Sequence, residues 1–290
     1  MRTTEPGKVG NPSESTRVDI LVHSYNHEDT IVKCLTSILA QSHPNLFVTV
    51  VADSSSDSTW QRIIQTQQRF PGRVTAKTTP QRQGIGEGSI EGREYFKPLG
   101  NFWGMIDGDD WWVDQDKVKT QLTLLGSNPL AVGCSAVAVV CDRFGARVGE
   151  IRSEPDSWSF LDWVVGTRGI YTHASTILWR NIFRAGGGFL PRSYISRFPR
   201  GEWPLTLAFL AESRGVMLRL DKEVSIYNIT GMGAWSGLSL EERNEKNAAT
   251  NAAISRNIPL RFKIGYTLNR VGLRLLARKL SVRESETPDF

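Results

Sequence analysis

The chain lacks three features that would each have placed it in a definite class of protein. No run of apolar residues approaches the roughly 20 needed to cross a bilayer as a helix. The first residues contain no apolar core of the kind that a secretory signal peptide carries. The three cysteines, Cys34, Cys134 and Cys141, have no spacing typical of a metal site. We therefore expect a cytoplasmic protein whose cysteines are buried, reduced thiols.

What the chain does contain is enough apolar material for a substantial core. Of its 290 residues, 40% are hydrophobic, which suits one large core or two closely joined half-domains. Residues 1–16, rich in Ser, Thr, Pro, Gly and charge, are expected to be a flexible leader. Polar or surface roles are expected for the four histidines, which lack metal-site spacing: His23, His27, His43 and His173.

Positive charge is concentrated near the C-terminal end. Between residues 261 and 283 lie seven basic residues and no acidic one, and the net charge of +5 less these seven leaves −2 on the rest. Arg270, Arg274 and Arg278 recur beside an apolar stripe, which predicts a basic amphipathic helix. Two interpretations stay open: a helix packed on the core, or a helix attached to an anionic membrane surface. Nucleic acid is not expected as a partner, because no binding motif accompanies the patch.

Strand and helix patterns alternate through the first half of the chain. Short apolar runs predict strands at 18–22, at 47–51, near Val74 and at 102–106. Helical periodicity follows the first two, with Asn26 and Asp57 as expected N-caps. Strands that alternate with helices imply a largely parallel sheet. Three loops are expected to meet at one edge of it: 23–28, 53–57 and 107–110.

The most informative run is MIDGDDWW, which places three carboxylates, Asp107, Asp109 and Asp110, after an apolar stretch. Ionised carboxylates this close repel one another, and a hard divalent ion such as Mg²⁺ or Mn²⁺, which also holds substrate phosphates, relieves that repulsion. Such residues also make solvated turns. Their place at the end of a buried strand favours a ligand site, because α/β sheets bind ligands there.

These motifs resemble a known family. The segments VDILVHSYNHEDTIVKCLTSILAQ, VTVVADSSSDST and GNFWGMIDGDDWW resemble the nucleotide-sugar-binding half of family 2 glycosyltransferases. THASTILWRN and the stretch that begins GEWPLTLAFLAES resemble the acceptor half, so the resemblance covers roughly residues 17–238. It implies an α/β fold of GT-A type, with a Rossmann-like, mostly parallel mixed sheet flanked by helices and a C-terminal helical tail. The expected divisions are 17–112 for the nucleotide-sugar half, 113–240 for the acceptor half and 241–290 for the tail.

The resemblance also implies roles for individual residues around the donor. Tyr25 matches the aromatic that stacks on the nucleotide base, and Asp53 matches the acid that accepts a hydrogen bond from uracil or thymine. Asp107, Asp109 and Asp110 match acids that hold the ribose and, through Mn²⁺ or Mg²⁺, the diphosphate. Asp109 is the first choice as metal ligand and Asp107 the second. The expected nucleotide-binding set is His23, Tyr25, Asn26, Asp53, Gly84, Asp107 and Asp110.

In the acceptor half, Glu202 matches the family's general base. That carboxylate takes the proton of an acceptor hydroxyl as the oxygen attacks the anomeric carbon, and the product has inverted configuration. An acid in the first turn of a helix is also favoured by the helix dipole alone. Trp203 and Trp235 are expected to border the acceptor and donor sugars, although large aromatics at such spacing are also common in cores.

The chain departs from the family pattern at several positions. Ala52 stands where relatives have the first acid of an Asp-Asp pair, and Ser89 where many carry arginine. Asn228 and Thr230 stand where relatives often place Arg and His. A basic contact to the diphosphate is thus in doubt, and so is donor choice. The glycines between 84 and 88 open no helix after a strand, so a loop is expected there and not a dinucleotide site.

Taken together, these features predict a metal-dependent inverting glycosyltransferase. It would move a sugar from a nucleotide diphosphate donor, UDP or dTDP favoured, to a hydroxyl acceptor in cell-surface polysaccharide, glycolipid or glycopeptide biosynthesis. Two alternatives stay open: a nucleotidyltransferase on a similar sheet, and a non-catalytic module that binds nucleotide sugars or glycans. The enzyme would work in the cytoplasm or on the inner face of the membrane, and the sequence leaves its oligomeric state open.

Overall fold

The computed structural model describes residues 14–82, 95–164, 169–170, 172–182, 202–230 and 237–257. Its strands are β1 (Val18–Ser24), β2 (Leu46–Ala52), β3 (Val74–Thr78), β4 (Phe102–Asp107), β5 (Trp111–Trp112), β6 (Ala131–Cys141), β7 (Arg147–Ile151), β8 (Ser157–Ser159), β9 (Leu178–Arg180) and β10 (Val216–Asn228). Its helices are α1 (Ile31–Leu39), α2 (Thr59–Arg69), α4 (Lys117–Gly126), α5 (Phe160–Val164), the 3₁₀ turn η1 (Ala174–Thr176), α7 (Glu202–Ser213) and α8 (Leu240–Asn257).

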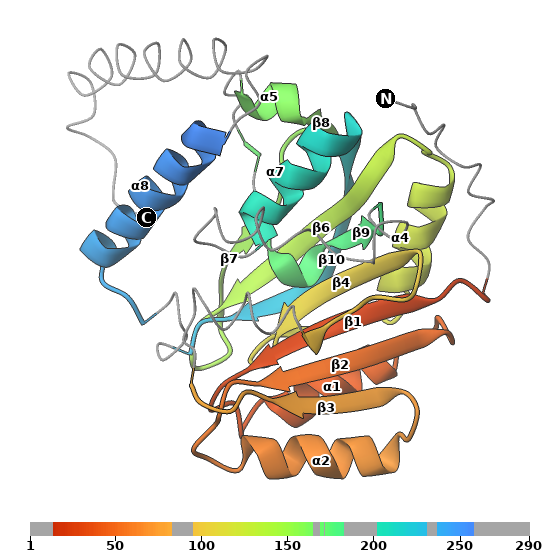
Figure 1. Ribbon diagram of the computed structural model, residues 1–290, viewed down its shortest axis with the longest axis vertical. Coiled ribbons are helices and arrows are strands. Elements are labelled where there is room, and N and C mark those ends of the chain that lie inside the picture. The colour runs from red at the N-terminus through yellow and green to blue at the C-terminus, as the bar shows by residue number, and fades with distance from the viewer. Residues whose placement is uncertain are drawn as a thin grey trace.

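The ten strands in the described ranges belong to one mixed sheet, in the order β3-β2-β1-β4-β9-β6-β10-β5, with β7 beside β6 and β8 beside β10 (Figure 1). The first four strands of this order run parallel to one another, as the alternating strand and helix patterns predict. β9 then runs antiparallel to both β4 and β6, while β10 is parallel to β6 and antiparallel to β5 and β8. The expected α/β mixed sheet is confirmed, and its four consecutive parallel strands come from the first half of the chain.

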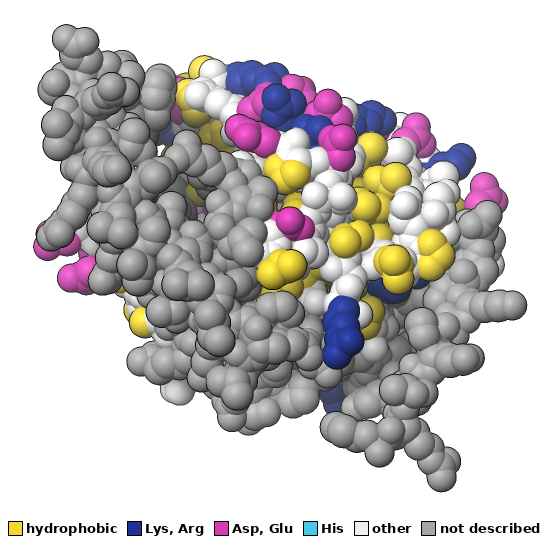
Figure 2. Space-filling model, turned by 90° about the horizontal axis from the view of Figure 1, so that it is seen from above, with side chains coloured by type: hydrophobic (Ala, Val, Ile, Leu, Met, Phe, Trp, Pro, Cys, Tyr) yellow, Lys and Arg dark blue, Asp and Glu magenta, His cyan; other side chains and the backbone are white. Residues whose placement is uncertain are grey.

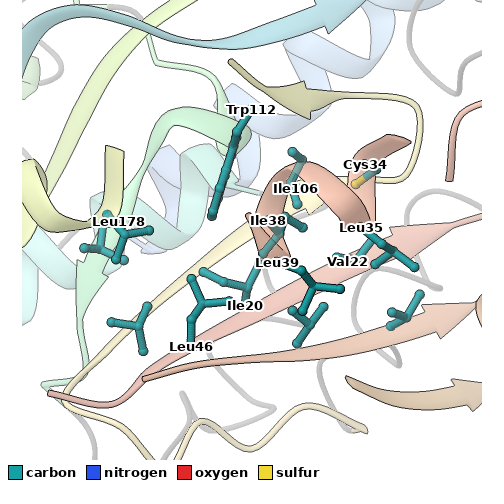
Figure 3. Packing of buried hydrophobic residues seen from close by; sticks show 14 of the residues in the cluster. Ile20, Val22, Cys34, Leu35, Ile38, Leu39, Leu46, Ile106, Trp112 and Leu178 are labelled. Carbon is teal, nitrogen blue, oxygen red and sulfur yellow. The ribbon is translucent and has the colours of Figure 1, made fainter. Parts of the chain in front are cut away.

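Helices cover both faces of the sheet, because alternate residues of a strand point to opposite faces. In β1, Val18, Ile20 and Val22 pack with α1, α2 and α4, whereas Leu21 belongs to the core under α5 and α7. Figure 3 shows the side chains of α1 lying against those of β1 and β4. Figure 1 shows α5 and α7 in front of the opposite face. The buried thiols are confirmed too, since all three cysteines are free and buried.

One of the two predicted helix caps is wrong. Asn26 does not cap α1, which begins at Ile31 after Thr30, because Asn26 lies in a left-handed turn with φ 51° and its amide bonds to another loop. Asp57 does assist α2, although Ser58 is the formal cap. The Asp57 Oδ1 atom accepts a hydrogen bond from the Thr59 backbone N–H at 2.9 Å, which satisfies a backbone donor in the first turn of α2.

Two predictions fall on parts of the chain outside the described residues. The leader is described only from Glu14, and the basic stretch 261–283 lies beyond Asn257, where the described part of α8 ends. Within the described ranges, no helix is both long and apolar enough to span a membrane. Figure 2 shows charged side chains of both signs intermixed with scattered hydrophobic ones on the face that it draws.

Candidate functional site

The three predicted loops meet at the carboxyl edge of the parallel strands. His23 of β1 is in register with Asp107 of β4, and Ser24 with Ala52 of β2. Just beyond these pairs, the Gly108 N–H donates to the His23 carbonyl at 2.7 Å, and the Asp53 N–H donates to the Ser24 carbonyl at 2.8 Å. Because all three strands run parallel, the residues that follow them lie at the same edge of the sheet.

The acids that follow β4 occupy different environments. The Asp107 side chain is 57% exposed, with one oxygen 3.9 Å from His23 Nδ1. The Asp109 side chain is only 13% exposed and lies 3.7 Å from His27 Nε2. Burial raises the pKa of Asp109 to about 6, because a carboxylate loses the hydration that stabilises its charge. Burial likewise lowers the pKa of His27, so the imidazole offers this acid little positive charge.

Asp110, the third acid, points into the protein. Its side chain is 2% exposed, and one oxygen accepts a hydrogen bond from the Asn228 backbone N–H at 3.0 Å. The other oxygen lies 3.8 Å from His173 Nε2. The expected contact of Asp110 with the nucleotide stays a prediction. In the structure, Asp110 ties residues 107–110, here called the acid turn, to the end of β10.

Gly108 allows the turn to lie this close to α1. A Cβ atom at this position would lie 2.8 Å from His27 Nδ1, 3.0 Å from Ile31 Cδ1 and 3.0 Å from Ser24 Oγ. These separations are shorter than ordinary van der Waals contact, so a larger residue would push the acids away from β1. The glycine between the acids is thus a packing requirement of the site.

A buried polar cluster behind the acids was not anticipated from the sequence. His173 Nδ1 lies 2.8 Å from Ser175 Oγ, which is 2.8 Å from Ser225 Oγ, and the His173 ring packs on Tyr227 with centroids 4.5 Å apart. Burial lowers the pKa of His173 to about 4, so the ring is neutral at pH 7. Burial and the three acids raise the pKa of Tyr227 to about 12. Ser175 is fully buried, so this Asp-His-Ser series cannot serve as a nucleophilic triad.

The part of this edge that is expected to contact the nucleotide base, here called the base side, contains Asp53 and Tyr25. Asp53 Oδ1 accepts a hydrogen bond from Thr79 Oγ1 at 2.9 Å, which joins it to the residue after β3. The Arg82 guanidinium lies 4.0 Å from the centroid of the Tyr25 ring and covers one of its faces. A base that stacks on Tyr25 would therefore use the other face or displace Arg82.

Comparison with known proteins agrees with this geometry. Residues 19–186 match the family model described as glycosyl transferase family 2. The chain belongs to this family. It is 25% identical over 145 residues to TuaG of Bacillus subtilis, named for teichuronic acid biosynthesis, and the match covers 50% of this chain and 56% of TuaG. It is 27% identical over 114 residues to WfgD of Escherichia coli, named UDP-Glc:alpha-D-GlcNAc-diphosphoundecaprenol beta-1,3-glucosyltransferase, over 39% of this chain and 43% of WfgD. The chain thus spans about half the length of these curated relatives.

Two solved structures support the GT-A-like fold. TarS of S. aureus in complex with UDP-GlcNAc superposes with a TM-score of 0.62 at 17% identity, covering 93% of this chain and 76% of that one. The mannosyltransferase PcManGT of Pyrobaculum calidifontis, in complex with GDP-Man and Mn²⁺, gives a TM-score of 0.52 at 14% identity, covering 96% and 90%. At these identities the likeness establishes the fold alone.

Two predicted site residues of this family 2 chain lie outside the described residues, Gly84 and Trp235. Glu202 and Trp203 begin α7, but only their backbone is described. Across the described ranges, no group of three or more His, Cys, Asp or Glu side chains is arranged to hold a metal ion. The roles of these four residues stay predictions.

Proposed function

We propose that this chain transfers a sugar from a nucleotide diphosphate sugar to an acceptor hydroxyl, with the help of a divalent metal ion. One observation carries the proposal: Asp53 after β2, and Asp107 and Asp109 at the end of β4, lie at one edge of the sheet on either side of β1, in a chain of glycosyl transferase family 2. The base of a nucleotide diphosphate is separated from its diphosphate by a ribose, so the two ends of such a donor could contact acids on different strands.

The acids that remain accessible fit Mn²⁺ or Mg²⁺. Asp110 is engaged by the Asn228 N–H, which leaves Asp107 and Asp109. Mg²⁺ is usually bound through one or two carboxylates, with water and substrate phosphates completing its shell, so a third protein ligand is not required. Burial raises the pKa of Asp109 to about 6, and a bound cation would lower it again and keep this carboxylate charged at pH 7. When bound, the ion would neutralise charge on the departing nucleoside diphosphate.

The base side favours uracil or thymine. The ring of Tyr25 would supply a stacking surface that tolerates any base, on the face opposite Arg82 or in place of Arg82, and Asp53 would supply an acceptor for a ring N–H of uracil or thymine. Both residues follow strands that are paired in register, which fixes the spacing between the two contacts. UDP and dTDP sugars are therefore the proposed donors.

The acceptor half would supply the general base. Glu202, the first residue of α7, would take the proton of the acceptor hydroxyl as its oxygen attacks the anomeric carbon from the side opposite the leaving group, which inverts the configuration. Trp203 and Trp235 would border the sugars. The names of TuaG and WfgD support an acceptor in cell-surface polysaccharide, glycolipid or glycopeptide biosynthesis. The basic segment beyond Asn257 would then bring the enzyme to lipid-linked acceptors at an anionic membrane.

The test is a screen of UDP- and dTDP-sugars with Mn²⁺, in which the released products are identified. We expect at least one donor to release its nucleoside diphosphate slowly in water and faster with a suitable acceptor. Release of pyrophosphate instead would identify a nucleotidyltransferase. Donor binding without release of either product, with all acceptors tried, would identify a non-catalytic binding module.

A further inference from the structure

The two loops that carry Tyr25 and Asp53 contain an unusual backbone feature. Three non-glycine residues in the described ranges have positive φ, and two of them, Asn26 at 51° and Ser54 at 49°, directly follow Tyr25 and Asp53. Non-glycine residues adopt this conformation infrequently, Asn more often than most, and such residues gather at functional sites. The third, Arg214 at 56°, follows α7 and serves below as a control.

Asn26 makes several of the hydrogen bonds that join the two loops. Its Oδ1 accepts a hydrogen bond from the Ser56 N–H at 2.9 Å, and its Nδ2 donates to Ser56 Oγ at 3.2 Å. The Asn26 backbone N–H donates to Ser55 Oγ at 3.2 Å. Asn26 thus donates hydrogen bonds to, and accepts one from, the loop about 30 positions later in the chain. Its partners, Ser55 and Ser56, directly follow Asp53 and the left-handed Ser54.

Further bonds extend the junction on both sides. Toward the helices, Glu28 Oε2 accepts from the Ser58 N–H at 3.1 Å, Asp57 accepts from the Glu28 N–H at 3.1 Å, and the His27 N–H donates to Thr59 Oγ1 at 2.7 Å. Toward β3, Ser54 Oγ donates to the Thr79 carbonyl at 2.7 Å. The loops are therefore held as one unit, with Asn26 nearest to Tyr25.

We infer that Asn26 is a positioning residue that sets the preference of this site for uracil or thymine over bases without a ring N–H on that edge, such as cytosine. Stacking on Tyr25 does not distinguish bases, whereas the Asp53 acceptor rewards only a ring with an N–H at the right place. Selectivity then requires a fixed spacing between ring and carboxylate, and the bonds of Asn26 fix it. This role rests on the proposed function, because it assumes that the edge binds a nucleotide.

Two substitutions separate the side-chain bonds of Asn26 from its backbone conformation. Asn26→Gly keeps the left-handed turn without strain and removes the amide. Asn26→Asp keeps the acceptor for the Ser56 N–H and tolerates the same φ. We expect Asn26→Gly to lower the preference for UDP over CDP roughly tenfold, the order of one hydrogen bond to a charged group, and Asn26→Asp to restore most of it. Arg214→Gly, which relieves the left-handed residue after α7, should leave nucleotide affinity unchanged.

The experiment measures UDP and CDP affinities with Mn²⁺ by calorimetry, in wild type, in each Asn26 variant, in Asp53→Asn, and in Asn26→Gly combined with Asp53→Asn. If Asn26 acts through Asp53, its effect on the UDP:CDP ratio should vanish in the Asp53→Asn background. An unchanged ratio in Asn26→Gly, or the same change with and without Asp53, would overturn the inference. Absence of any nucleotide binding by the folded wild-type protein would instead overturn the proposed function.

Discussion

The two halves of the sheet are built by different rules. In β3-β2-β1-β4 every pairing is parallel and in register, so the loops that follow the strands fall at one edge. Around β9, β6 and β10 the pairings are mixed, and the β10–β6 ladder is interrupted by register shifts. The first half places Asp53, Asp107 and Asp109 at this edge. The second half supports the acid turn through the hydrogen bond from the Asn228 N–H to Asp110, with the His173 ring packed nearby.

If the parallel half binds the donor and α7 supplies the general base, Glu202→Gln should lower turnover without changing the affinity for the donor. We expect turnover to fall by about 10² to 10⁴, the usual contribution of a positioned acid or base, with the affinity for the donor unchanged. Steady-state kinetics and UDP titration check this. Glu212→Gln, the same change near the other end of α7, is the control and should leave turnover near that of wild type. Equal loss of binding and turnover in Glu202→Gln would assign this residue to structure.

The close packing of the acid turn against α1 can be broken at Gly108. We expect Gly108→Ala to lower the free energy of unfolding by about 1–3 kcal/mol, because the new methyl group meets His27, Ile31 and Ser24. Urea unfolding measures the change. Gly149→Ala in β7, where an added Cβ meets nothing within 4 Å, should cost far less. Similar stability of the two variants would contradict the described packing.

The burial of His173 in the mixed half should make the stability of the protein depend on pH. The pKa of His173 is lowered to about 4 in the folded protein, against about 6.5 when unfolded, so the unfolded chain binds more protons between these values. Stability from this group is present above pH 6.5 and is lost on acidification toward pH 4. Between pH 7 and pH 5 wild type should lose about 2 kcal/mol more than His173→Gln. Equal losses in urea unfolding would mean that His173 is not buried as described.

The smallest effect per residue is expected for the tail beyond Asn257. Each basic residue near an anionic leaflet contributes about 1 kcal/mol at low salt, so the full-length protein should co-sediment with anionic liposomes and dissociate at high salt. A chain truncated after Asn257 should not bind. Equal sedimentation of the truncated chain would remove the membrane role and leave the helix as a packed element.

The same contrast explains what the sequence could and could not predict. The strands and helices of the parallel half follow from local apolar patterns, and the meeting of the loops near Asp53 and Asp107 follows from parallel topology. The cluster of His173 and Tyr227 does not, because it joins residues from η1 and β10 through contacts that no local pattern encodes. The prediction that Asn26 caps α1 is wrong because an Asn before a helical pattern is typical of both a cap and a left-handed turn.

The most direct test of the account is calorimetric titration of UDP with and without Mn²⁺, using wild type and Asp109→Asn. An amide lacks the charge that holds a hard cation against a diphosphate, so we expect Mn²⁺ to strengthen UDP binding to wild type and to have no effect on the variant. Asp156→Asn, a change at an 88% exposed carboxylate of the other half, should keep the wild-type response. Unchanged Mn²⁺-dependent UDP affinity in a folded Asp109→Asn protein would contradict the assignment of the acid turn as the metal and diphosphate site.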